Sequence, residues 1–460
     1  MSLDIMKQLQ KVIPKERVST NETIRKQHSR DESFHPPNLP DVVVCPKTTN
    51  EISDLMKIAY HSEIPVVPFG VGSGLEGQAI PLKGGISINF GQMNQILEIN
   101  PDDLLVKVQP GVTRKELNKE LGKHGLFFSV DPGADASIGG MVSTNASGTT
   151  AVKYGNMKEN ILDLEVVLSD GRVIRTGSKA KKSSSGYNLT ELFVGSEGTL
   201  GVFSEITLKV YGIPESIVAG IALFPSVYDA AKATVAALSI GSSIARSDLI
   251  DALSIKQINQ ANGTNYKEGV TLFLEIHSHK STMRHEVDMI KEIFEQNGCS
   301  HFEVGEDTKA RAELWEMRHN LYYLYLHHNP GKTMMNTDVC VPISKTPQAL
   351  EFARKVLEKS NLMGAVIGHI GDGNFHAGLI INPNDPSDME MANNVNEQIV
   401  QHALKLGGSC TGEHGVGLGK MKYQKLQHGE ALNIMKDIKI VLDPKNILNL
   451  GKIFEADRVI

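Results

Sequence analysis

The hydrophobic pattern changes near residue 213 and divides the chain into two regions. Before it, short apolar runs of strand length alternate with glycine-rich segments. After it, strand-like runs alternate with long stretches in which apolar residues recur every three or four positions, as in amphipathic helices. Strands with helices between them, rather than strict βαβ repeats, predict an α+β fold.

The expected elements follow from these runs. In the first region we expect strands at 42–45, 65–69, 86–90, 96–100, 104–109 and a hairpin over 161–176, with helices at 49–62 and 113–123. In the second we expect strands at 221–224, 271–277, 336–341, 365–370 and 375–381, with helices at 227–239, 282–297, 308–328, 347–360, 388–406 and 430–442.

Three glycine-rich segments lie in the first region. Gly72-Ser-Gly-Leu-Glu-Gly77 follows a strand and matches G-x-G-x-x-G, but Pro81 and Gly84-Gly85 come next, where a Rossmann site needs a helix. A nicotinamide site of that kind is therefore excluded. The backbone N–H groups of such a loop can still cradle a diphosphate. The segments Pro132–Gly148 and Gly195–Val202 have the same small-residue character.

The second region carries a candidate metal site. Two apolar runs flank Gly371-Asp-Gly-Asn374, which predicts a hairpin with His369 opposite His376 and Cβ atoms about 5 Å apart. Glu413 and His414 follow in a glycine-flanked loop. Two histidines and a glutamate with open positions are typical of a catalytic metal site, so His369, His376 and Glu413 are the predicted ligands. Zinc, manganese and iron all suit them; the alternative is a pair of solvated hairpin histidines.

Composition excludes several classes of protein. The net charge of −6 gives no reason to expect nucleic acid or an anionic membrane as partner. No apolar run approaches transmembrane length, and residues 1–8 do not resemble a signal peptide. The four cysteines are scattered without a CxxC pair, which favours reduced thiols in a cytoplasmic protein and offers no iron–sulfur module.

The motifs together resemble one flavoprotein family. Pro68-Phe-Gly-Val-Gly-Ser-Gly74, Asp131-Pro-Gly-Ala, Asn145-Ala-Ser-Gly148 and Phe193-Val-Gly-Ser-Glu-Gly-Thr-Leu-Gly201 are similar to the vanillyl-alcohol oxidase/p-cresol methylhydroxylase superfamily. With Gly368-His-Ile-Gly-Asp-Gly-Asn-Phe-His376 and Cys410-Thr-Gly-Glu-His-Gly415, the chain resembles the branch of glycolate oxidase flavin subunits, D-lactate dehydrogenases and D-2-hydroxyglutarate dehydrogenases.

The resemblance implies a two-domain α+β flavoprotein. We expect an N-terminal arm over 1–39, an FAD-binding domain over 40–212, a substrate domain with an antiparallel sheet over 213–424, and a segment over 425–460 that returns to the FAD domain. The residues implied to bind FAD are Pro68, Gly70, Gly72, Ser73, Gly74, Leu75, Pro132, Gly133, Ala134, Ser137, Ile138, Gly139, Gly140, Ser143, Asn145, Gly148, Glu197, Gly201, Val202 and Asn449. Some members attach FAD to a histidine in the first glycine loop; this loop has none, so we expect non-covalent FAD.

The implied reaction is the oxidation of a small 2-hydroxy acid to a 2-oxo acid, with hydride passing to flavin N5. A divalent metal would lower the pKa of the substrate hydroxyl, His414 would take its proton as general base, and Arg318 would bind the substrate carboxylate. Members that use a larger dicarboxylate have lysine and asparagine where this chain has Asn336 and Gly378. That difference favours glycolate or D-lactate over D-2-hydroxyglutarate.

Two further alternatives stay open from the sequence. One is a metal-dependent hydrolase whose glycine loops bind a nucleotide. The other is a flavin subunit that is active only within a multi-subunit glycolate oxidase, with electron-transfer partner subunits. The electron acceptor is not indicated, and a homodimer is expected.

Overall fold

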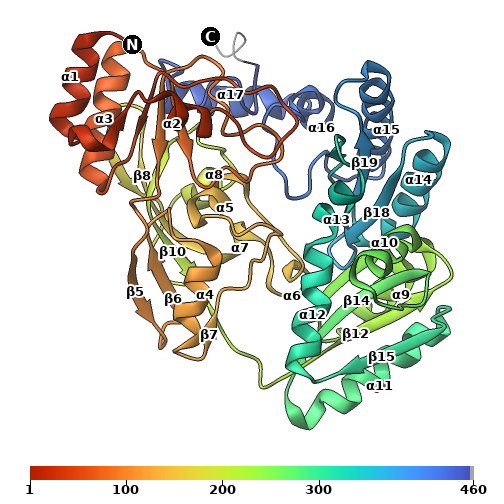
Figure 1. The fold of residues 1–460 in the computed structure, drawn as a ribbon. Coiled ribbons are helices and arrows are strands. Elements are labelled where there is room, and N and C mark those ends of the chain that lie inside the picture. The colour runs from red at the N-terminus through yellow and green to blue at the C-terminus, as the bar shows by residue number, and fades with distance from the viewer. Residues whose placement is uncertain (456–460) are drawn as a thin grey trace. The chain divides into compact units, whose positions relative to one another are not determined.

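The computed structural model describes residues 1–455, except for the side chains of residues 261, 262, 319 and 322. Contacts divide it into two units. The first contains residues 1–146, 156–213 and 414–460, and the second contains residues 147–155 and 214–413. The second unit therefore ends at Glu413, before the boundary at 424 expected from the sequence. Figure 1 labels the elements along the chain.

The first unit begins with a small mixed sheet. Its strands lie in the order β1 (Val18–Ser19), β2 (Val42–Val44), β4 (Ile86–Asn89) and β3 (Val66–Phe69), and the last three are parallel. Helix α3 (Thr49–Ser62) joins β2 to β3 and begins where the Thr48 side chain accepts the N–H of Glu51. The first glycine-rich loop leaves the end of β3, and no helix follows it. The predicted departure from a Rossmann site is confirmed.

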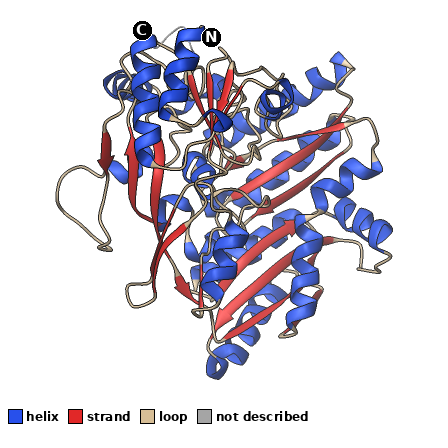
Figure 2. Cartoon of the chain, turned by 60° about the vertical axis from the view of Figure 1, so that its left-hand side comes forward, coloured by secondary structure: helices blue, strands red, loops and turns tan. Residues whose placement is uncertain are grey.

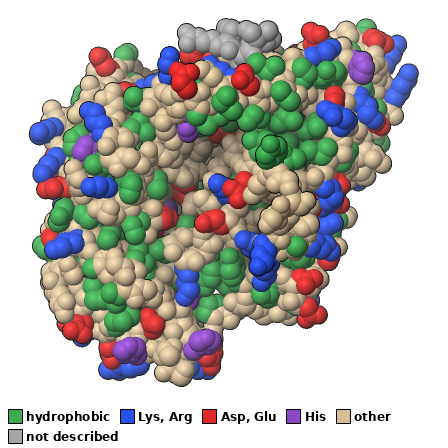
Figure 3. Space-filling model, turned by 180° about the vertical axis from the view of Figure 1, so that it is seen from behind, with side chains coloured by type: hydrophobic (Ala, Val, Ile, Leu, Met, Phe, Trp, Pro, Cys, Tyr) green, Lys and Arg blue, Asp and Glu red, His purple; other side chains and the backbone are tan. Residues whose placement is uncertain are grey.

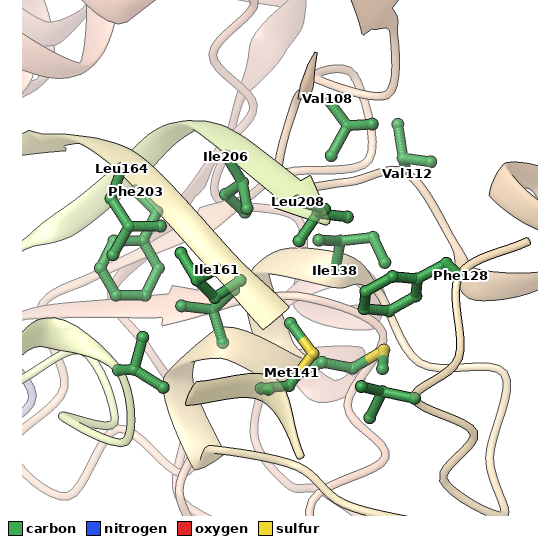
Figure 4. Packing of buried hydrophobic residues seen from close by; sticks show 14 of the residues in the cluster. Val108, Val112, Phe128, Ile138, Met141, Ile161, Leu164, Phe203, Ile206 and Leu208 are labelled. Atoms are coloured by element: carbon green, nitrogen blue, oxygen red, sulfur yellow. The ribbon is translucent and has the colours of Figure 1, made fainter. Parts of the chain in front are cut away.

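An antiparallel five-stranded sheet completes the core of this unit. Its order is β5 (Ile96–Asn100), β6 (Leu105–Val108), β10 (Val202–Lys209), β8 (Ile161–Val167) and β9 (Val173–Arg175). Phe128, Ile138 and Met141 pack against Ile161 and Leu208 (Figure 4). Since Ile138 and Met141 lie on α5 (Ile138–Thr144), this core fixes the second glycine-rich segment.

Short elements complete the first unit. They are α1 (Leu3–Val12), α2 (Glu22–Gln27), α4 (Arg114–Gly122), α7 (Met157–Asn160), α8 (Leu189–Phe193), α16 (Gln424–His428), α17 (Ala431–Leu442), the 3-10 helices η1 (Lys15–Arg17) and η3 (Met421–Tyr423), and the strand pair β7 (Leu126–Phe127) and β11 (Tyr211–Gly212). The C-terminal segment joins the first sheet through a parallel bridge between Leu448 and Val66. The Lys439 ammonium, buried on α17, donates to the carbonyl of Thr199.

The second unit contains an eight-stranded antiparallel sheet, visible with its helices in Figure 2. The order is β15 (His301–Gly305), β12 (Ser216–Phe224), β14 (Val270–Ser278), β13 (Ile244–Ile250), β18 (Gly364–His369), β19 (Asn374–Ile381) and β16 (Thr333–Asn336), with β17 (Val339–Cys340) also paired to β19. Its helices are α6 (Ala151–Tyr154), α9 (Val227–Ser239), α10 (Ala252–Asn262), α11 (Lys280–Gln296), α12 (Thr308–His319), α13 (Leu321–His328), α14 (Thr346–Lys359), α15 (Pro386–Lys405) and the 3-10 helix η2 (Ile343–Lys345).

Four features of this unit differ from the sequence prediction. The strands β13 and β15 and the helix α10 were not expected, and the helix expected over 308–328 is divided at Asn320 into α12 and α13. Strand β13 was missed because its central residues, Arg246, Ser247 and Asp248, are polar. Two of them, Ser247 and Asp248, are nevertheless buried.

A short piece of chain from the first region belongs to the second unit. Residues 147–155 contain α6, whose Lys153 ammonium donates to the carbonyl of His277 at 2.7 Å. The Tyr154 hydroxyl lies 2.7 Å from His277 Nδ1. These bonds attach α6 to the end of β14.

Acidic and basic side chains both occur across the face seen in Figure 3. Among the described helices, none has the length and apolar composition needed to cross a membrane.

Candidate active site

The two predicted metal-binding histidines lie on the hairpin of β18 and β19, but in a different register from the one expected. His369 pairs with Asn374, and His376 pairs with Ile367. The expected pairing of His369 with His376 is therefore wrong by two residues. The strands pair from 374 onward because the Asn374 side-chain amide donates to Asp338 Oδ1 and to the carbonyl of Val339.

The shift does not separate the histidines, because successive side chains alternate between the faces of a sheet and a shift of two keeps the face. The rings of His369 and His376 lie 5.8 Å apart between centroids, at 81° to each other. Both side chains are buried.

Glu413 completes the cluster. Its Oε1 atom lies 3.4 Å from His369 Nε2 and 3.2 Å from His376 Nε2. The loop that carries Glu413 is fixed by the fully buried Asp338, whose Oδ2 accepts the Thr411 hydroxyl at 2.6 Å and the backbone N–H groups of Gly412 and Glu413 at 2.8 and 3.0 Å. A Cβ on Gly412 would lie 1.9 Å from the Asn374 amide nitrogen, so this position requires glycine.

The other ring nitrogen of each histidine has its own partner. His369 Nδ1 lies 2.6 Å from Asp248 Oδ1, and His376 Nδ1 lies 3.1 Å from the carbonyl of Thr337. Partners of this kind fix the tautomer of metal-binding histidines and direct Nε2 toward the metal. Asp248, Thr337 and Asp338 were not identified as site residues from the sequence. The signal in the sequence was a carboxylate, Asp248, directly before the apolar pair Leu249-Ile250.

The donor set fits a divalent cation. The ligand atoms of His369, His376 and Glu413 all lie within 4.8 Å of one another. Ligands about 2.1 Å from one tetrahedral metal lie roughly 3.4 Å apart, which matches the two nitrogen–oxygen distances from Glu413. These three side chains would hold the cation.

Electrostatics at this cluster favour charged groups. Burial raises the pKa of Glu413, but the His369 and His376 imidazoles outweigh burial and hold that pKa well below its usual range. Burial lowers the pKa of His369, while the carboxylates of Asp248 and Glu413 outweigh burial and raise it well above its usual range. A cation that binds here must displace the proton from His369, so metal binding competes with protonation.

Arg318 lies beside this cluster within the second unit. It is buried on α12, and its Nε atom is 2.7 Å from Asp248 Oδ2. The contact is an ion pair rather than a well-aligned hydrogen bond. Arg318 is thus joined to His369 through a single carboxylate.

The three glycine-rich segments come together in the first unit. A Cβ on Gly70 would lie 2.4 Å from Ser137 Oγ, and a Cβ on Gly198 would lie 2.9 Å from Pro68. The third segment also donates the N–H of Glu197 to the carbonyl of Ser143 at 2.8 Å. The predicted FAD-binding residues from 68–75, 137–145 and 197–202 are therefore neighbours in space. Pro132, Gly133 and Ala134 precede α5, and Gly148 lies in the stretch that joins the second unit.

Two predicted residues in the third segment are required by packing. A Cβ on Gly201 would lie 2.4 Å from Val166 Cγ1, and the Val202 side chain is buried in the hydrophobic core. The Glu197 carboxylate accepts the backbone N–H groups of Val416 and Gly417 at 2.5 and 2.9 Å. Glu197 therefore holds the loop after His414.

The fit to FAD rests on this cradle and on two polar atoms. Within the described part of the chain, the buried Ser137 Oγ and Asn449 Oδ1 make no hydrogen bond. Asn449 Nδ2 donates to the carbonyls of Gln78 and Glu197 at 3.0 and 2.6 Å, so Asn449 ties the C-terminal segment to the first and third glycine segments. His414 belongs to the same unit, and its carbonyl accepts Gln78 Nε2 at 2.7 Å.

Both halves of the chain match known protein families. Residues 40–177 match the model of an FAD binding domain, and residues 213–453 match the C-terminal domain of FAD linked oxidases. The probable mitochondrial D-lactate dehydrogenase of Danio rerio is 45% identical over 444 residues, which cover 96% of this chain and 89% of that protein. The glycolate oxidase subunit GlcD of Bacillus subtilis is 32% identical over 460 residues, which cover 99% and 97%.

A solved structure supports the fold. p-Cresol methylhydroxylase with substrate bound superposes with a TM-score of 0.80 at 15% identity, covering 99% of this chain and 97% of that one. The predicted α+β flavoprotein fold and the predicted FAD cofactor are confirmed. The chain belongs to the family of FAD-linked oxidases and is an FAD-dependent oxidoreductase.

Proposed function

We propose that this protein oxidises a small 2-hydroxy acid, with D-lactate as the first candidate and glycolate as the second, to the corresponding 2-oxo acid. The observation that carries the proposal is the convergence of His369, His376 and Glu413, with Arg318 joined to His369 through Asp248. A cation-binding cluster beside an arginine suits an anionic substrate that also carries a hydroxyl. Relatives named D-lactate dehydrogenase and glycolate oxidase subunit support the choice of acid.

The residues have separate tasks in this reaction. Arg318 would bind the substrate carboxylate through its terminal nitrogens, since its Nε faces Asp248. His414 would take the proton of the 2-hydroxyl as general base. His369, His376 and Glu413 would hold a divalent cation, zinc, manganese or iron. When bound, the cation supplies charge that lowers the pKa of the hydroxyl, and FAD supplies the acceptor for the α-hydrogen with its electron pair.

The cofactor would be held by the first unit. The glycine segments around Gly70, Ser137 and Gly198 pack directly against one another, so the backbone N–H groups of all three segments would be available to one ligand. Asn449 presents a buried oxygen in the same unit. We propose the remaining predicted residues of these segments as FAD contacts through their backbone atoms. The expected homodimer and cytoplasmic location stay predictions.

Anaerobic mixing with a panel of acids tests the function. The purified yellow protein is mixed with D-lactate, glycolate, L-lactate and D-2-hydroxyglutarate, and the loss of flavin absorbance is followed. We expect rapid bleaching by D-lactate or glycolate, slower bleaching by D-2-hydroxyglutarate, and loss of bleaching after treatment with a chelator. Bleaching that is fastest with D-2-hydroxyglutarate, or that is unaffected by removal of all divalent metal, contradicts the proposal.

A further inference from the structure

Asp248 occupies a central position in the sheet of the second unit. It lies on β13 directly opposite His369 on β18, and its side chain is fully buried. Each carboxylate oxygen contacts a different side chain: Oδ1 lies 2.6 Å from His369 Nδ1, and Oδ2 lies 2.7 Å from Arg318 Nε. One carboxylate therefore contacts both a proposed metal ligand and the proposed carboxylate-binding arginine.

The contact between Asp248 and His369 fixes the tautomer and the orientation of the imidazole ring. When Nδ1 donates to a carboxylate, the lone pair of Nε2 is left for the metal and the ring cannot rotate freely. Nε2 of His369 faces Glu413 as this requires. His376 is held differently, because the nearest partner of its Nδ1 is the carbonyl of Thr337 at 3.1 Å, with the Asp338 carboxylate farther away at 3.6 Å.

The contact between Asp248 and Arg318 fixes the position of the guanidinium group. Helix α12 is attached to the sheet by two side chains one turn apart: Trp315 Nε1 donates to Glu275 Oε2 at 2.7 Å, and Arg318 pairs with Asp248. Glu275 pairs with Arg246, two residues before Asp248, so both carboxylates lie on the same face of the sheet. Within the described part of the chain, Nε makes the closest ion-pair contact of Arg318, and the two terminal nitrogens donate no hydrogen bond. They remain for an anion.

We propose that Asp248 is a positioning residue that orients the His369 imidazole and the Arg318 guanidinium together. The metal ligand and the anion-binding arginine then keep a fixed relation, so that a 2-hydroxy acid can meet both. This inference rests on the proposed function and adds to it a residue that touches neither substrate nor metal.

The variant Asp248→Asn tests the inference with little change of shape. An amide has one acceptor oxygen and no charge, so it can serve His369 or Arg318 but not both. Asp251→Asn is the matched control. Asp251 is also buried, also pairs with an arginine (Arg354, 3.0 Å), and lies three residues along the chain, where it accepts the N–H and hydroxyl of Ser254 rather than contacting His369.

Metal-free protein is titrated with MnCl₂, and free Mn²⁺ is followed by electron paramagnetic resonance. Loss of such an orienting partner typically weakens metal binding by about 10–100-fold. We expect this loss in Asp248→Asn, together with a raised KM for D-lactate, while Asp251→Asn changes neither quantity. Melting temperature and FAD content show whether each variant is folded. If Asp248→Asn is not folded, Asp248→Ser, whose small side chain leaves room for water, replaces it with the same criteria.

The outcomes separate this inference from the function on which it rests. Wild-type protein that binds Mn²⁺ beside an Asp248→Asn variant with unchanged Mn²⁺ affinity and unchanged KM overturns the role of Asp248 alone. An equal loss in Asp251→Asn overturns it too, because the effect would then follow general damage to the sheet. Wild-type protein that binds no divalent metal overturns the metal centre of the proposed function, and this inference with it.

Discussion

Glu413 and His414 share a peptide bond, yet they are anchored in different units. The N–H of Glu413 donates to Asp338 in the second unit, and the carbonyl of His414 accepts Gln78 Nε2 in the first. The proposed metal ligand and the proposed base are thus fixed independently. Substitutions of Glu413 and of His414 should therefore have separable effects on metal binding and on flavin reduction.

Non-covalent FAD is the first prediction. The loop over 68–78 contains no histidine, cysteine or tyrosine that could form a bond to the flavin. Precipitation with acid should release all yellow colour into the supernatant. A yellow pellet after washing would show a covalent link elsewhere in the chain.

Substitution of His376 should remove metal and leave flavin. The three proposed ligands lie in the second unit, whereas Gly70, Ser137 and Glu197 lie in the first. We expect His376→Ala to be folded and yellow but to lack metal by elemental analysis, and to be reduced slowly by D-lactate. His402→Ala is the control, because His402 stacks on Phe352 and is not a member of the cluster. Equal metal content in the wild type and His376→Ala would refute the assignment.

Substitution of His414 should leave metal and FAD bound and slow the flavin reduction. Loss of a general base typically costs about 10²–10⁴-fold in rate. His428→Ala, which removes a histidine of α16 in the same unit, should reduce its flavin at the wild-type rate. Stopped-flow measurement of flavin bleaching compares the three proteins. A His414→Ala variant as fast as wild type would exclude His414 as the base.

Arg318→Lys should raise KM for the acid and lower turnover. Arginine can face Asp248 with Nε while its terminal nitrogens bind a carboxylate, whereas lysine has one nitrogen for both tasks. Arg354→Lys, which alters the neighbouring pair with Asp251, is the control and should retain wild-type KM. Unchanged steady-state kinetics for Arg318→Lys would place this residue outside the substrate site.

The pH dependence of stability should reveal the raised pKa of the Glu197 carboxyl group. Burial raises its pKa from 4.5 to about 7, although the N–H groups of Val416 and Gly417 act in the opposite direction. Between these pH values the unfolded chain loses the proton and the folded chain keeps it, so the free energy of unfolding falls as the pH rises. Wild type should therefore lose stability relative to Glu197→Gln between pH 4.5 and about 7 in thermal melts.

Glu275→Gln supplies the comparison for that measurement. The pairs with Arg246 and His277 overcome burial and lower the pKa of Glu275 to about 2, so its stabilising contribution is complete above pH 4.5 and is lost as the pH falls further. The difference in stability between Glu275→Gln and wild type should stay constant between pH 4.5 and about 7. If the stability difference between Glu197→Gln and wild type is also independent of pH in this range, Glu197 is ionised in the folded protein throughout the range.

The sequence was informative where the pattern is local. Helix α9 begins and ends at the residues expected, and the hairpin of β18 and β19 was found from its turn residues. The metal ligands were identifiable because His369 and His376 lie on one hairpin. The register of the hairpin could not be predicted in the same way, because it depends on the hydrogen bond from the Asn374 side-chain amide to Asp338, a residue distant in sequence.

Asp248 shows what a single chain cannot reveal. Its role depends on β13 lying beside β18, a pairing between strands about 120 residues apart that no local pattern encodes. Polar residues at the centre of β13 also weaken the alternation that would mark the strand. The same polarity that makes Asp248 useful at the site therefore hid the strand that carries it.

The attachment of α6 to His277 has a consequence for building chimeric enzymes. Exchange of residues 214–413 between two members of the family would leave Lys153 and Tyr154 of one parent facing β14 of the other. To keep the second unit intact, residues 147–155 must be exchanged together with residues 214–413. A library that recombines substrate preference in this family should therefore place four crossovers in the chain, rather than two.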